Sequence, residues 1–484
     1  MNQTMPHWLS KQAELNPYKI AIETNAKSLT FLELKNESQV FAKKLASFGV
    51  KQHARVAVLS ANHLDMVIAI HALSYLNAVV VLLNTRLSKQ ELHYQLEQSE
   101  ATFLILTEGL KDEKNLAFQK QKTFQDVRNQ HEVDASLSTH IDLNVPFTMM
   151  FTSGTTGLPK GVIHTYGNHW WSAIGSVLNL GLTEKDKWLL MLPMFHVGGL
   201  SILIRSVIYG MSVYLLEKYD AQFVYRAIVQ KRITILSVVT LMLRELLEEM
   251  GKEELPSYVR CLLLGGGSVP DDLLQQVKEK NIPLFQSYGL TETSSQIVTL
   301  SKEDALEKLG SAGKPLFPAE IKIANQNHEG VGEIWVKGPM VMDGYIKDET
   351  ANKLAFENGW FKTGDIGYLD SEGFLYVVDR RSDLIISGGE NIYPSEVENK
   401  ILQLEYVHEA AVVGKKDDDW GQVPVAFVVR ESDQLSEKTI QDYLKDVLAT
   451  YKIPKKIIFR ESLPKNASNK IMRHQLKKQL GEHS

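Results

Sequence analysis

The sequence contains only one cysteine, Cys261, in 484 residues. A lone cysteine excludes an intramolecular disulfide framework, and its place in the apolar run 259–264 predicts a buried strand residue rather than a nucleophile. No apolar run approaches the roughly 20 residues needed to span a bilayer, since the run 78–83 is closed by Asn84. The first residues also lack the basic start and apolar stretch of a secretion signal. We therefore expect a cytoplasmic protein without stable membrane insertion.

The sequence also lacks an excess of charge of either sign. There are 53 Lys and Arg residues against 58 Asp and Glu residues, which gives a net charge of -5. A domain that binds nucleic acid normally carries a basic patch, so nucleic acid is not an expected partner. The chain has no internal repeat or low-complexity tract, and its length predicts two or more domains.

Short β-rich runs alternate with amphipathic stretches in the first part of the chain. The β-rich runs are 55–59, 78–83 and 102–106, and the stretches between them, 63–76 and 89–98, have helical spacing. Similar apolar runs recur at 188–192, 213–216, 233–238 and 261–264. This alternation predicts an α/β fold, with parallel-rich sheets and flanking helices in a large N-terminal domain of several subdomains.

After about Asp365 the sequence changes to alternating, turn-rich segments such as 373–378 and 423–429. These segments predict a smaller α+β module. No linker rich in Gly, Ser or Pro precedes it, so we expect a short hinge near 379–383. The predicted domains are therefore residues 1–381 and 382–484.

The strongest local signal is the sequence Thr-Ser-Gly-Thr-Thr-Gly-Leu-Pro-Lys-Gly at 152–161, which follows the apolar run 147–151. Hydroxyl groups and backbone N–H groups of such a loop can approach phosphate oxygens, and a lysine adds positive charge. A Walker loop would continue into a helix after Gly-Lys-Ser/Thr, whereas 161–163 continue as a strand. A turn of the same composition that binds nothing is the alternative. The candidate phosphate-binding residues are Thr152, Ser153, Gly154, Thr155, Thr156, Gly157 and Lys160.

This loop resembles the signature of the adenylate-forming superfamily, which includes acyl-CoA synthetases, adenylation domains of peptide synthetases and luciferases. Further motifs resemble those of the family and follow the same order, at 192–199, 264–268, 286–293, 359–365, 379–383 and 464–470. The resemblance implies a large ATP-binding domain and a small mobile C-terminal domain. It also implies an AMP-forming ligase that uses ATP and Mg²⁺ to make an acyl-adenylate, and then transfers the acyl group to coenzyme A.

For the nucleotide site, the resemblance implies that Glu292 binds magnesium, as suits a hard oxygen donor, and that Thr291 donates to the α-phosphate. Tyr288 is expected near the adenine. Asp365 is expected to accept both ribose hydroxyls, and Arg380 to contact the ribose or a phosphate. A surface carboxylate at 292 and a plain Thr-Gly-Asp turn at 363–365 are the alternatives. The glycines expected to line this site are Gly265, Gly266, Gly267 and Gly289.

In the small domain, Lys470 resembles the lysine that bridges the attacking carboxylate and the α-phosphate. The family usually has glycine before this lysine, but Asn469 stands here, and asparagine tolerates left-handed backbone geometry. Lys465 is the alternative lysine. Ser382 is expected at the hinge. Gly388 and Gly389 would let the thiol arm of coenzyme A pass close to the backbone, although their segment is common to the whole family.

The acid pocket is expected to include His196, which would gate the pocket or bind the carboxylate; a core or surface histidine is the alternative. Arg205 lies in the apolar run 200–208, where an unpaired cation is costly. Either the substrate carries a second anionic group, or this arginine faces the surface. The expected walls are Gly198, Gly199, Ser294, Ser295 and Gln296, together with the glycines at 265–267.

The segments 379–394, 311–317, 420–424 and 464–467 are similar to those of the subfamily that acts on 2-succinylbenzoate, an aromatic dicarboxylic acid of menaquinone biosynthesis. That acid would suit Arg205. A ligase for a medium-chain fatty acid or an aryl acid is the alternative. A non-catalytic nucleotide-binding protein is the alternative of a different class.

Overall fold

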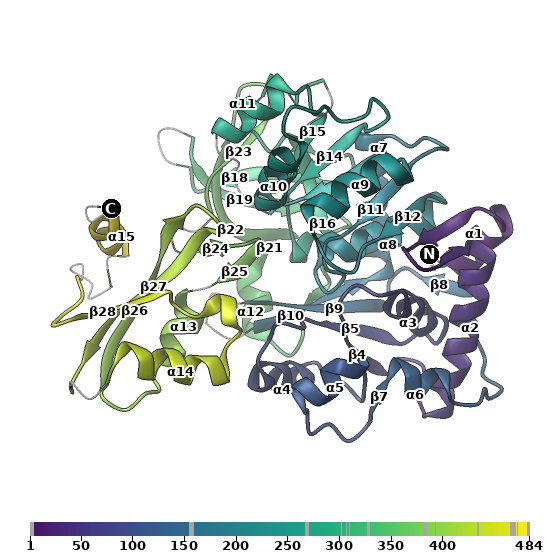
Figure 1. Cartoon of the computed structure of the whole chain (residues 1–484), viewed down its shortest axis with the longest axis horizontal. Helices are drawn as coiled ribbons and strands as arrows, with labels where there is room; N and C mark the ends of the chain where they lie inside the picture. Colours follow the sequence, from purple (N-terminus) through teal and green to yellow (C-terminus); the bar gives the residue numbers. More distant parts are fainter. Residues whose placement is uncertain are drawn as a thin grey trace.

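The structure is a computed structural model. It describes residues 4–153, 159–266, 271–301, 303–305, 307–308, 310–326, 330–380, 383, 385–392, 394–432, 435–464, 471 and 473–481. Two large, mostly parallel sheets form the body of the molecule, and the C-terminal domain lies at one side of it (Figure 1). The predicted α/β fold class is confirmed.

The first large sheet has the strand order β20-β10-β9-β5-β4-β6-β7. Strands β4, β5 and β6 are parallel, and helices α3 and α4 cross between them, as the alternating sequence predicted. The strands are β4 (Arg55–Leu59), β5 (Val79–Leu83), β6 (Phe103–Leu106), β7 (Gln121–Thr123), β9 (Pro146–Ser153), β10 (Pro159–Thr165) and β20 (Gly344–Tyr345). The nearby helices are α2 (Phe31–Ser47), α3 (Leu64–Tyr75), α4 (Lys89–Gln98), α5 (Glu108–Lys114), α6 (Phe124–Arg128) and α12 (Glu349–Ala355).

The second large sheet has the order β17-β16-β15-β14-β13-β11-β12-β2-β3, and its six central strands are parallel. Cys261 begins β14 and is fully buried, and burial raises the pKa of its thiol to about 12, so the predicted buried strand residue is confirmed. The strands are β2 (Ile20–Glu23), β3 (Ser28–Thr30), β11 (Lys187–Leu190), β12 (Ser212–Leu215), β13 (Ile235–Val238), β14 (Cys261–Leu264), β15 (Leu284–Leu290), β16 (Ser295–Thr299) and β17 (Lys314–Pro315). The helices are α1 (Trp8–Leu15), α7 (Tyr166–Leu180), α8 (Val197–Tyr209), α9 (Ala221–Lys231), α10 (Thr240–Met250) and α11 (Asp271–Glu279), and β1 (Thr4–Pro6) pairs with β8 (His140–Asp142).

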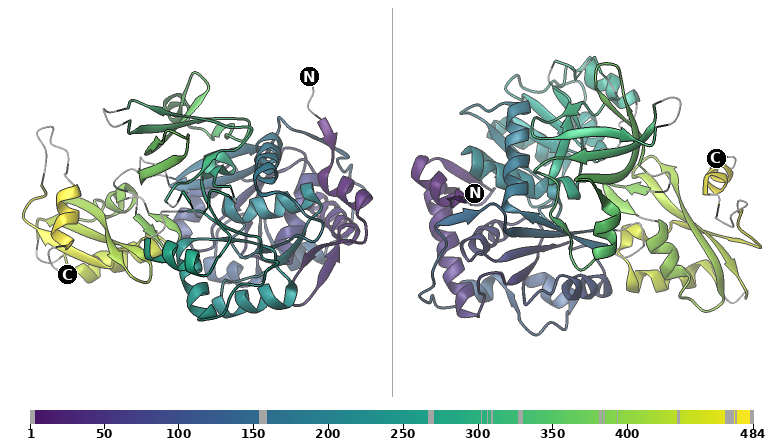
Figure 2. Two further views of the ribbon diagram at one scale, coloured as in Figure 1. Left: turned by 90° about the horizontal axis from the view of Figure 1, so that it is seen from above. Right: turned by 180° about the vertical axis from the view of Figure 1, so that it is seen from behind.

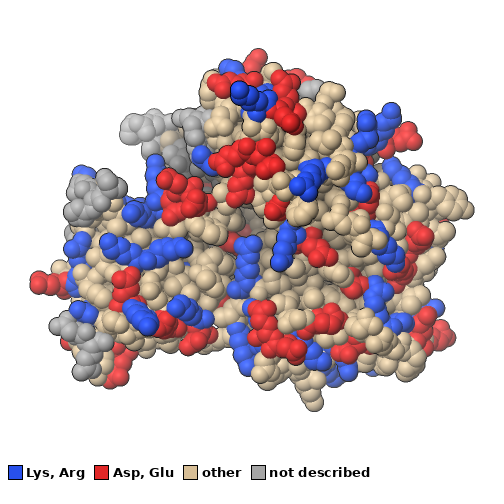
Figure 3. Space-filling model, in the orientation of Figure 1, with Lys and Arg blue, Asp and Glu red and all other residues tan. Residues whose placement is uncertain are grey.

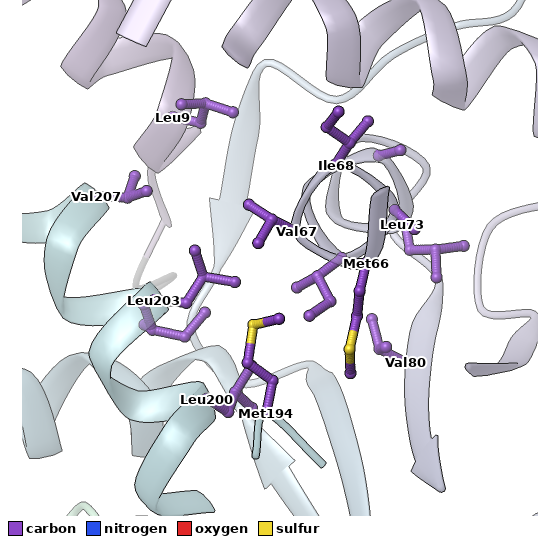
Figure 4. Packing of buried hydrophobic residues seen from close by; sticks show 14 of the residues in the cluster. Leu9, Met66, Val67, Ile68, Leu73, Val80, Met194, Leu200, Leu203 and Val207 are labelled. Carbon is purple, nitrogen blue, oxygen red and sulfur yellow. The ribbon is translucent and has the colours of Figure 1, made fainter. Parts of the chain in front are cut away.

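Helices α3 and α8 pack together in the largest hydrophobic cluster, between the two sheets (Figure 4). Val67 of α3 faces Leu203 of α8 there, and Met194 and Leu200 lie beside them. Burying each such aliphatic side chain contributes roughly 1.5–3 kcal/mol. The packing fixes the loop from β11 to α8, which carries His196 and forms one wall of the site described below.

A third, smaller sheet has the order β18-β19-β22-β21, with β23 paired to β22. Its strands are β18 (Glu320–Ala324), β19 (Gly332–Lys337), β21 (Phe356–Glu357), β22 (Trp360–Leu369) and β23 (Leu375–Arg380). Because β23 belongs to this sheet, the change in sequence after Asp365 does not mark the start of the small domain. The predicted boundary between 381 and 382 lies outside the described residues and stays a prediction.

The small domain has its own sheet in the order β25-β24-β27-β26, with β28 parallel to β27. It stands beside the two large sheets in both views of Figure 2. Its strands are β24 (Ile385–Ser387), β25 (Glu390–Ile392), β26 (Val407–Asp417), β27 (Gly421–Arg430) and β28 (Lys456–Arg460), and its helices are α13 (Pro394–Ile401), α14 (Glu437–Val447) and α15 (Arg473–Gly481). Helix α13 begins at Pro394, which suits proline because the first turn of a helix needs no N–H donor there. Within the described ranges, no helix is both long and apolar enough to cross a membrane.

Candidate active site

A cavity of about 800 Å³ lies where the small domain meets the carboxyl ends of the parallel strands. In Figure 3 the surface is hollowed between the small domain, on the left, and the large domain. Its walls include Thr152, Glu292 and Asp365 of the large domain and Gly389 of the small domain. Ligands of parallel α/β sheets bind at this edge, so the topology brings distant motifs of the sequence to one place.

The predicted phosphate loop begins at the rim of this cavity. Thr152 lines the cavity near the end of β9, and the antiparallel strand β10 places Lys160 opposite Thr152. The predicted strand after Lys160 is confirmed by β10, which excludes a Walker loop. The Nζ atom of Lys160 lies 5.2 Å from the centre of the Tyr345 ring. Only the backbone of Ser153 is described, and Gly154, Thr155, Thr156 and Gly157 lie outside the described residues.

Thr291 and Glu292 form a short 3-10 turn that also lines the cavity. The Tyr345 hydroxyl donates to Glu292 Oε1 at 2.9 Å, and the Met342 N–H donates to the Glu292 carbonyl at 2.7 Å. Because Tyr345 lies on β20, which pairs with β10, the same tyrosine joins the carboxylate to the strand that carries Lys160. Tyr345 could not be predicted from the sequence, since a lone tyrosine after a glycine gives little signal.

A chain of hydrogen bonds behind this turn holds the backbone of Thr291. His164 Nε2 lies 2.6 Å from the Thr291 carbonyl oxygen, and Thr148 Oγ1 lies 3.3 Å from His164 Nδ1 and 2.8 Å from His169 Nε2. A carbonyl only accepts, so we assign the hydrogen of His164 to Nε2, and Thr148 then donates to Nδ1 and accepts from His169. Burial lowers the pKa of His164 to about 4, so the ring is neutral and the chain runs in one direction.

Asp365 lies on β22 and is 7% exposed. Its Oδ2 accepts a hydrogen bond from the Tyr288 hydroxyl at 2.7 Å. Tyr288 was expected near the adenine, and that role stays a prediction; its ring packs in a hydrophobic cluster. The tyrosine therefore supports the carboxylate from behind. The Arg380 backbone pairs with Asp365, and no more of that arginine is described.

The predicted glycines fall into place where the structure describes them. Gly265, Gly266 and Gly289 line the cavity, whereas Gly267 lies outside the described residues. A Cβ at Gly289 would lie 2.1 Å from the Ser295 carbonyl oxygen, so only glycine fits there.

The small domain reaches the cavity through the turn between β24 and β25. Gly388 and Gly389 line the cavity with positive φ angles of 55° and 81°, where glycine is favoured. A Cβ at Gly388 would lie 2.6 Å from the Trp420 ring, and the Cβ of a residue at 389 would touch Val239 of the large domain at 3.4 Å. Ser382, Lys465, Asn469 and Lys470 lie outside the described residues, and their roles stay predictions.

His196 contacts a residue of this same turn, Glu390. Its Nε2 lies 3.2 Å from Glu390 Oε2, and Arg86 Nη1 donates to Glu390 Oε1 at 3.0 Å. Burial acts to raise the pKa of Glu390, but His196 and Arg86 outweigh it and lower that pKa, so the carboxylate is charged. Arg86 was not among the predicted site residues, although its position just after a buried parallel strand is a usable signal.

Arg205, on α8, also lines the cavity. The residue is 1% exposed, so the surface alternative is wrong. Its Nη1 lies 3.4 Å from Gln296 Oε1, its Nη2 lies 3.3 Å from Ser172 Oγ, and its Nε has no hydrogen-bond partner. Among the described residues no carboxylate pairs with the guanidinium. The uncompensated charge is costly there, and burial lowers the pKa of Arg205.

The other predicted walls of the acid pocket are mostly in position. Gly198, Gly199, Ser295 and Gln296 line the cavity. Ser294 does not, because its hydroxyl donates to the Met340 carbonyl at 2.9 Å and the residue is fully buried. The left-handed backbone of Ser294, with a φ of 54°, turns this side chain away from the cavity.

The site suits magnesium bound together with a polyphosphate. No group of three or more His, Cys, Asp and Glu side chains that could hold a metal occurs among the described residues. Magnesium commonly uses one or two carboxylates, substrate phosphates and water, so Glu292 beside the phosphate loop is a fitting donor.

Two family models match the chain. The model described as AMP-binding enzyme matches residues 9–346, and the model described as AMP-binding enzyme C-terminal domain matches residues 396–470. The chain belongs to the AMP-binding enzyme family. The second match falls within the small domain, so both parts of this AMP-binding enzyme are of the family's type.

Relatives of this AMP-binding enzyme are similar over its full length. A 2-succinylbenzoate–CoA ligase of Oceanobacillus iheyensis is 53% identical over 482 residues, covering 99% of this chain and all of the relative. A double mutant of the o-succinylbenzoate CoA synthetase of Bacillus subtilis, bound to the product analogue OSB-NCoA, has 47% identity and a TM-score of 0.95, with 98% of each chain covered. The same enzyme with the acyl-adenylate OSB-AMP has 47% identity and the same coverage, but a TM-score of 0.77. It has also been solved with ATP and a magnesium ion.

The two TM-scores of the Bacillus subtilis enzyme differ although the identity and coverage are equal. The sequence match therefore does not cause the difference, and the overall arrangement of this AMP-binding enzyme matches that of the product-analogue complex better. In this arrangement Gly388, Gly389 and Glu390 line the cavity.

Proposed function

We propose that the protein is a 2-succinylbenzoate–CoA ligase. It would join 2-succinylbenzoate to ATP with release of pyrophosphate, and then transfer the acyl group to coenzyme A with release of AMP. The product, 2-succinylbenzoyl-CoA, belongs to menaquinone biosynthesis, and the cytoplasm, which holds ATP and coenzyme A, is the proposed location. The observation that best supports this choice of substrate is the buried Arg205, which lines the cavity without a carboxylate partner among the described residues.

Arg205 fits one carboxylate of a dicarboxylic acid. Its partners are the neutral Gln296 and Ser172 at 3.3–3.4 Å, which leave the charge unbalanced. A substrate carboxylate would supply the missing negative charge and an acceptor for the unpartnered Nε. The relatives named as 2-succinylbenzoate–CoA ligases support this choice over a medium-chain fatty acid or an aryl acid.

In the first step, the other carboxylate attacks the α-phosphorus of ATP. Thr152, Lys160 and Thr291 would hold the phosphates, and Asp365 would accept the ribose hydroxyls, held by the Tyr288 hydroxyl. Magnesium held by Glu292 would neutralise charge on the phosphate oxygens. Lys470 would stabilise the charge that develops between the two reactants, and Arg380 would contact the ribose or a phosphate.

In the second step, the thiol of coenzyme A attacks the acyl carbon and AMP leaves. The turn at Gly388 and Gly389 would form one wall of the path for the thiol arm, because neither residue has a side chain to block it. His196, held by Glu390, would stand beside the reacting carboxyl group. Ser382 would lie at the hinge between the proposed domains 1–381 and 382–484.

The first test is pyrophosphate exchange with magnesium-ATP and a panel of acids. We expect exchange of label into ATP with 2-succinylbenzoate, and AMP release with this acid when coenzyme A is added. A preference for octanoate or benzoate would replace the substrate assignment with the medium-chain or aryl alternative. An absence of exchange with every acid would support a non-catalytic nucleotide-binding protein.

A further inference from the structure

A buried lysine, Lys452, joins the two domains. It lies outside the sequence motifs that form the site. Lys452 Nζ lies 2.8 Å from Glu91 Oε1 and 2.7 Å from Glu396 Oε1. The lysine side chain is 4% exposed, and those of Glu91 and Glu396 are 6% and 4% exposed. Lys452 and Glu396 belong to the small domain, whereas Glu91 lies on α4 of the large domain, so one of the two ion pairs crosses between domains.

The segment that carries Lys452 is packed onto the large domain. Ala449 of the small domain is buried in a hydrophobic cluster whose other members, such as Leu87 and Leu92, belong to the large domain. Tyr451 packs against the same cluster. Tyr451 and Lys452 also line the cavity. The cross-domain contact is therefore continuous with the wall of the active site.

Lys452 and Glu396 move together if the small domain turns, whereas Glu91 stays with the large domain. The arrangement described here matches the relative bound to the product analogue with a TM-score of 0.95 and the acyl-adenylate complex with 0.77. We propose that Glu91 is a positioning residue for thioester formation: through Lys452, it holds the small domain where its glycine turn reaches the cavity. This inference rests on the proposed ligase function.

A second ionic contact between the domains is more exposed. Arg86, which pairs with Glu390, has a side chain that is 54% exposed, so water and salt weaken that pair. The pair of Lys452 and Glu91 is enclosed, and a buried ion pair depends strongly on geometry because each charge has lost its water. The pair of Lys452 and Glu91 therefore depends more strongly on one domain orientation than the pair of Arg86 and Glu390 does.

The two oxygens of Glu91 have different partners, which makes a clean substitution available. Oε2 accepts from the Ser88 N–H at 2.9 Å in a capping box at the start of α4, and Oε1 binds Lys452. Glutamine also forms capping boxes, so Glu91→Gln can keep its amide oxygen on the Ser88 N–H. The variant then presents a neutral NH₂ group to Lys452 instead of a charge, while α4 stays capped.

The experiment measures the two half-reactions of Glu91→Gln separately. We expect coenzyme A-dependent consumption of supplied 2-succinylbenzoyl-adenylate to slow by about tenfold or more, while pyrophosphate exchange changes by less than about twofold. Glu97→Gln is the matched control, since Glu97 is an exposed residue on the same helix, and it should leave both rates unchanged. The midpoint of thermal unfolding should be similar in all three proteins.

The outcomes are distinguishable. Equal loss in both half-reactions, or no loss in either, would overturn the positioning role of Glu91. An additional loss from Glu91→Gln in a Lys452→Met background, as large as in the wild type, would show that Glu91 does not act through Lys452. Failure of the proposed function itself appears differently, because wild-type protein would then lack both half-reactions with this acid.

Discussion

The two walls of the cavity are held by different kinds of interaction. On the side of the predicted phosphate loop, hydrogen bonds form within the large domain and their donors are neutral: the Tyr345 hydroxyl donates to the Glu292 carboxylate, and the His164 ring donates to the Thr291 carbonyl. On the side of the small domain, charged groups meet across the boundary: Glu390 with Arg86, and Lys452 with Glu91.

This difference indicates that the wall of the large domain keeps one geometry, whereas the wall of the small domain can move away. A hydrogen bond within one domain stays formed when the domains move, and leaving a partly buried partner unsatisfied costs about 1–3 kcal/mol. Charged groups at a domain boundary can regain water when the domains separate, which offsets much of the loss of the pair. The wall formed by the large domain is thus suited to one geometry, and the small domain to more than one orientation.

The largest expected effect comes from Lys470→Ala. Loss of a donor that acts in the transition state lowers a rate by roughly 100- to 1000-fold. We expect this loss in pyrophosphate exchange alone, with consumption of supplied adenylate by coenzyme A spared. Equal loss in both half-reactions would assign the adenylation role to another residue, such as Lys465.

The next largest effect is expected from Arg205→Met. Loss of charge-assisted hydrogen bonds to the substrate, about 2 to 3 kcal/mol, should raise the KM for 2-succinylbenzoate by roughly 30- to 150-fold. The free protein should keep or gain thermal stability, because methionine removes a buried charge without a carboxylate partner. Arg205→Lys is the matched control that retains the charge. An unchanged KM in the methionine variant would contradict a role in binding the acid.

Acid should test the neutral interior of the large domain. Burial lowers the pKa of His71, on α3, from 6.5 to about 4, so below pH 6.5 the unfolded chain binds a proton that the folded protein does not. The contribution of His71 to the free energy of unfolding is therefore complete above pH 6.5 and is lost as the pH falls towards 4. Between pH 7 and pH 5 this histidine should cost roughly 2 kcal/mol in the free energy of unfolding, measured with urea. A variant with His71→Leu that keeps the full slope would show that His71 is not the source.

The smallest expected effect comes from Tyr345→Phe, which removes the hydroxyl from Glu292 and keeps the ring beside Lys160. We expect pyrophosphate exchange to fall about tenfold, with a higher magnesium requirement, because a net hydrogen bond to a charged group contributes about 1.5–3 kcal/mol. Tyr94→Phe is the control, since its hydroxyl lies 3.4 Å from the Pro159 carbonyl, at the start of β10. Similar losses in both variants would argue against a specific link to Glu292.

The sequence predicted the elements that depend on local pattern. The alternation at 55–106 predicted parallel strands with crossover helices, and β4, α3, β5, α4 and β6 confirm it. The order of the family's motifs predicted that Thr152, Glu292 and Asp365 would share a site, and all three line one cavity. Ser294 was expected in the pocket wall, but its hydroxyl donates to the Met340 carbonyl, because the direction of a side chain depends on packing that a motif does not encode.

By itself, the sequence determined the fold class, the two-part organisation and the chemical type of the site, since strand periodicity and short motifs are local properties. Only the tertiary structure decided that Arg205 is buried without a carboxylate partner among the described residues, and that Tyr345, His164 and Glu91 bind Glu292, Thr291 and Lys452 of the cavity wall. The physical reason is that burial and pairing depend on residues hundreds of positions apart: Lys452 reaches Glu91 across 361 positions of the chain.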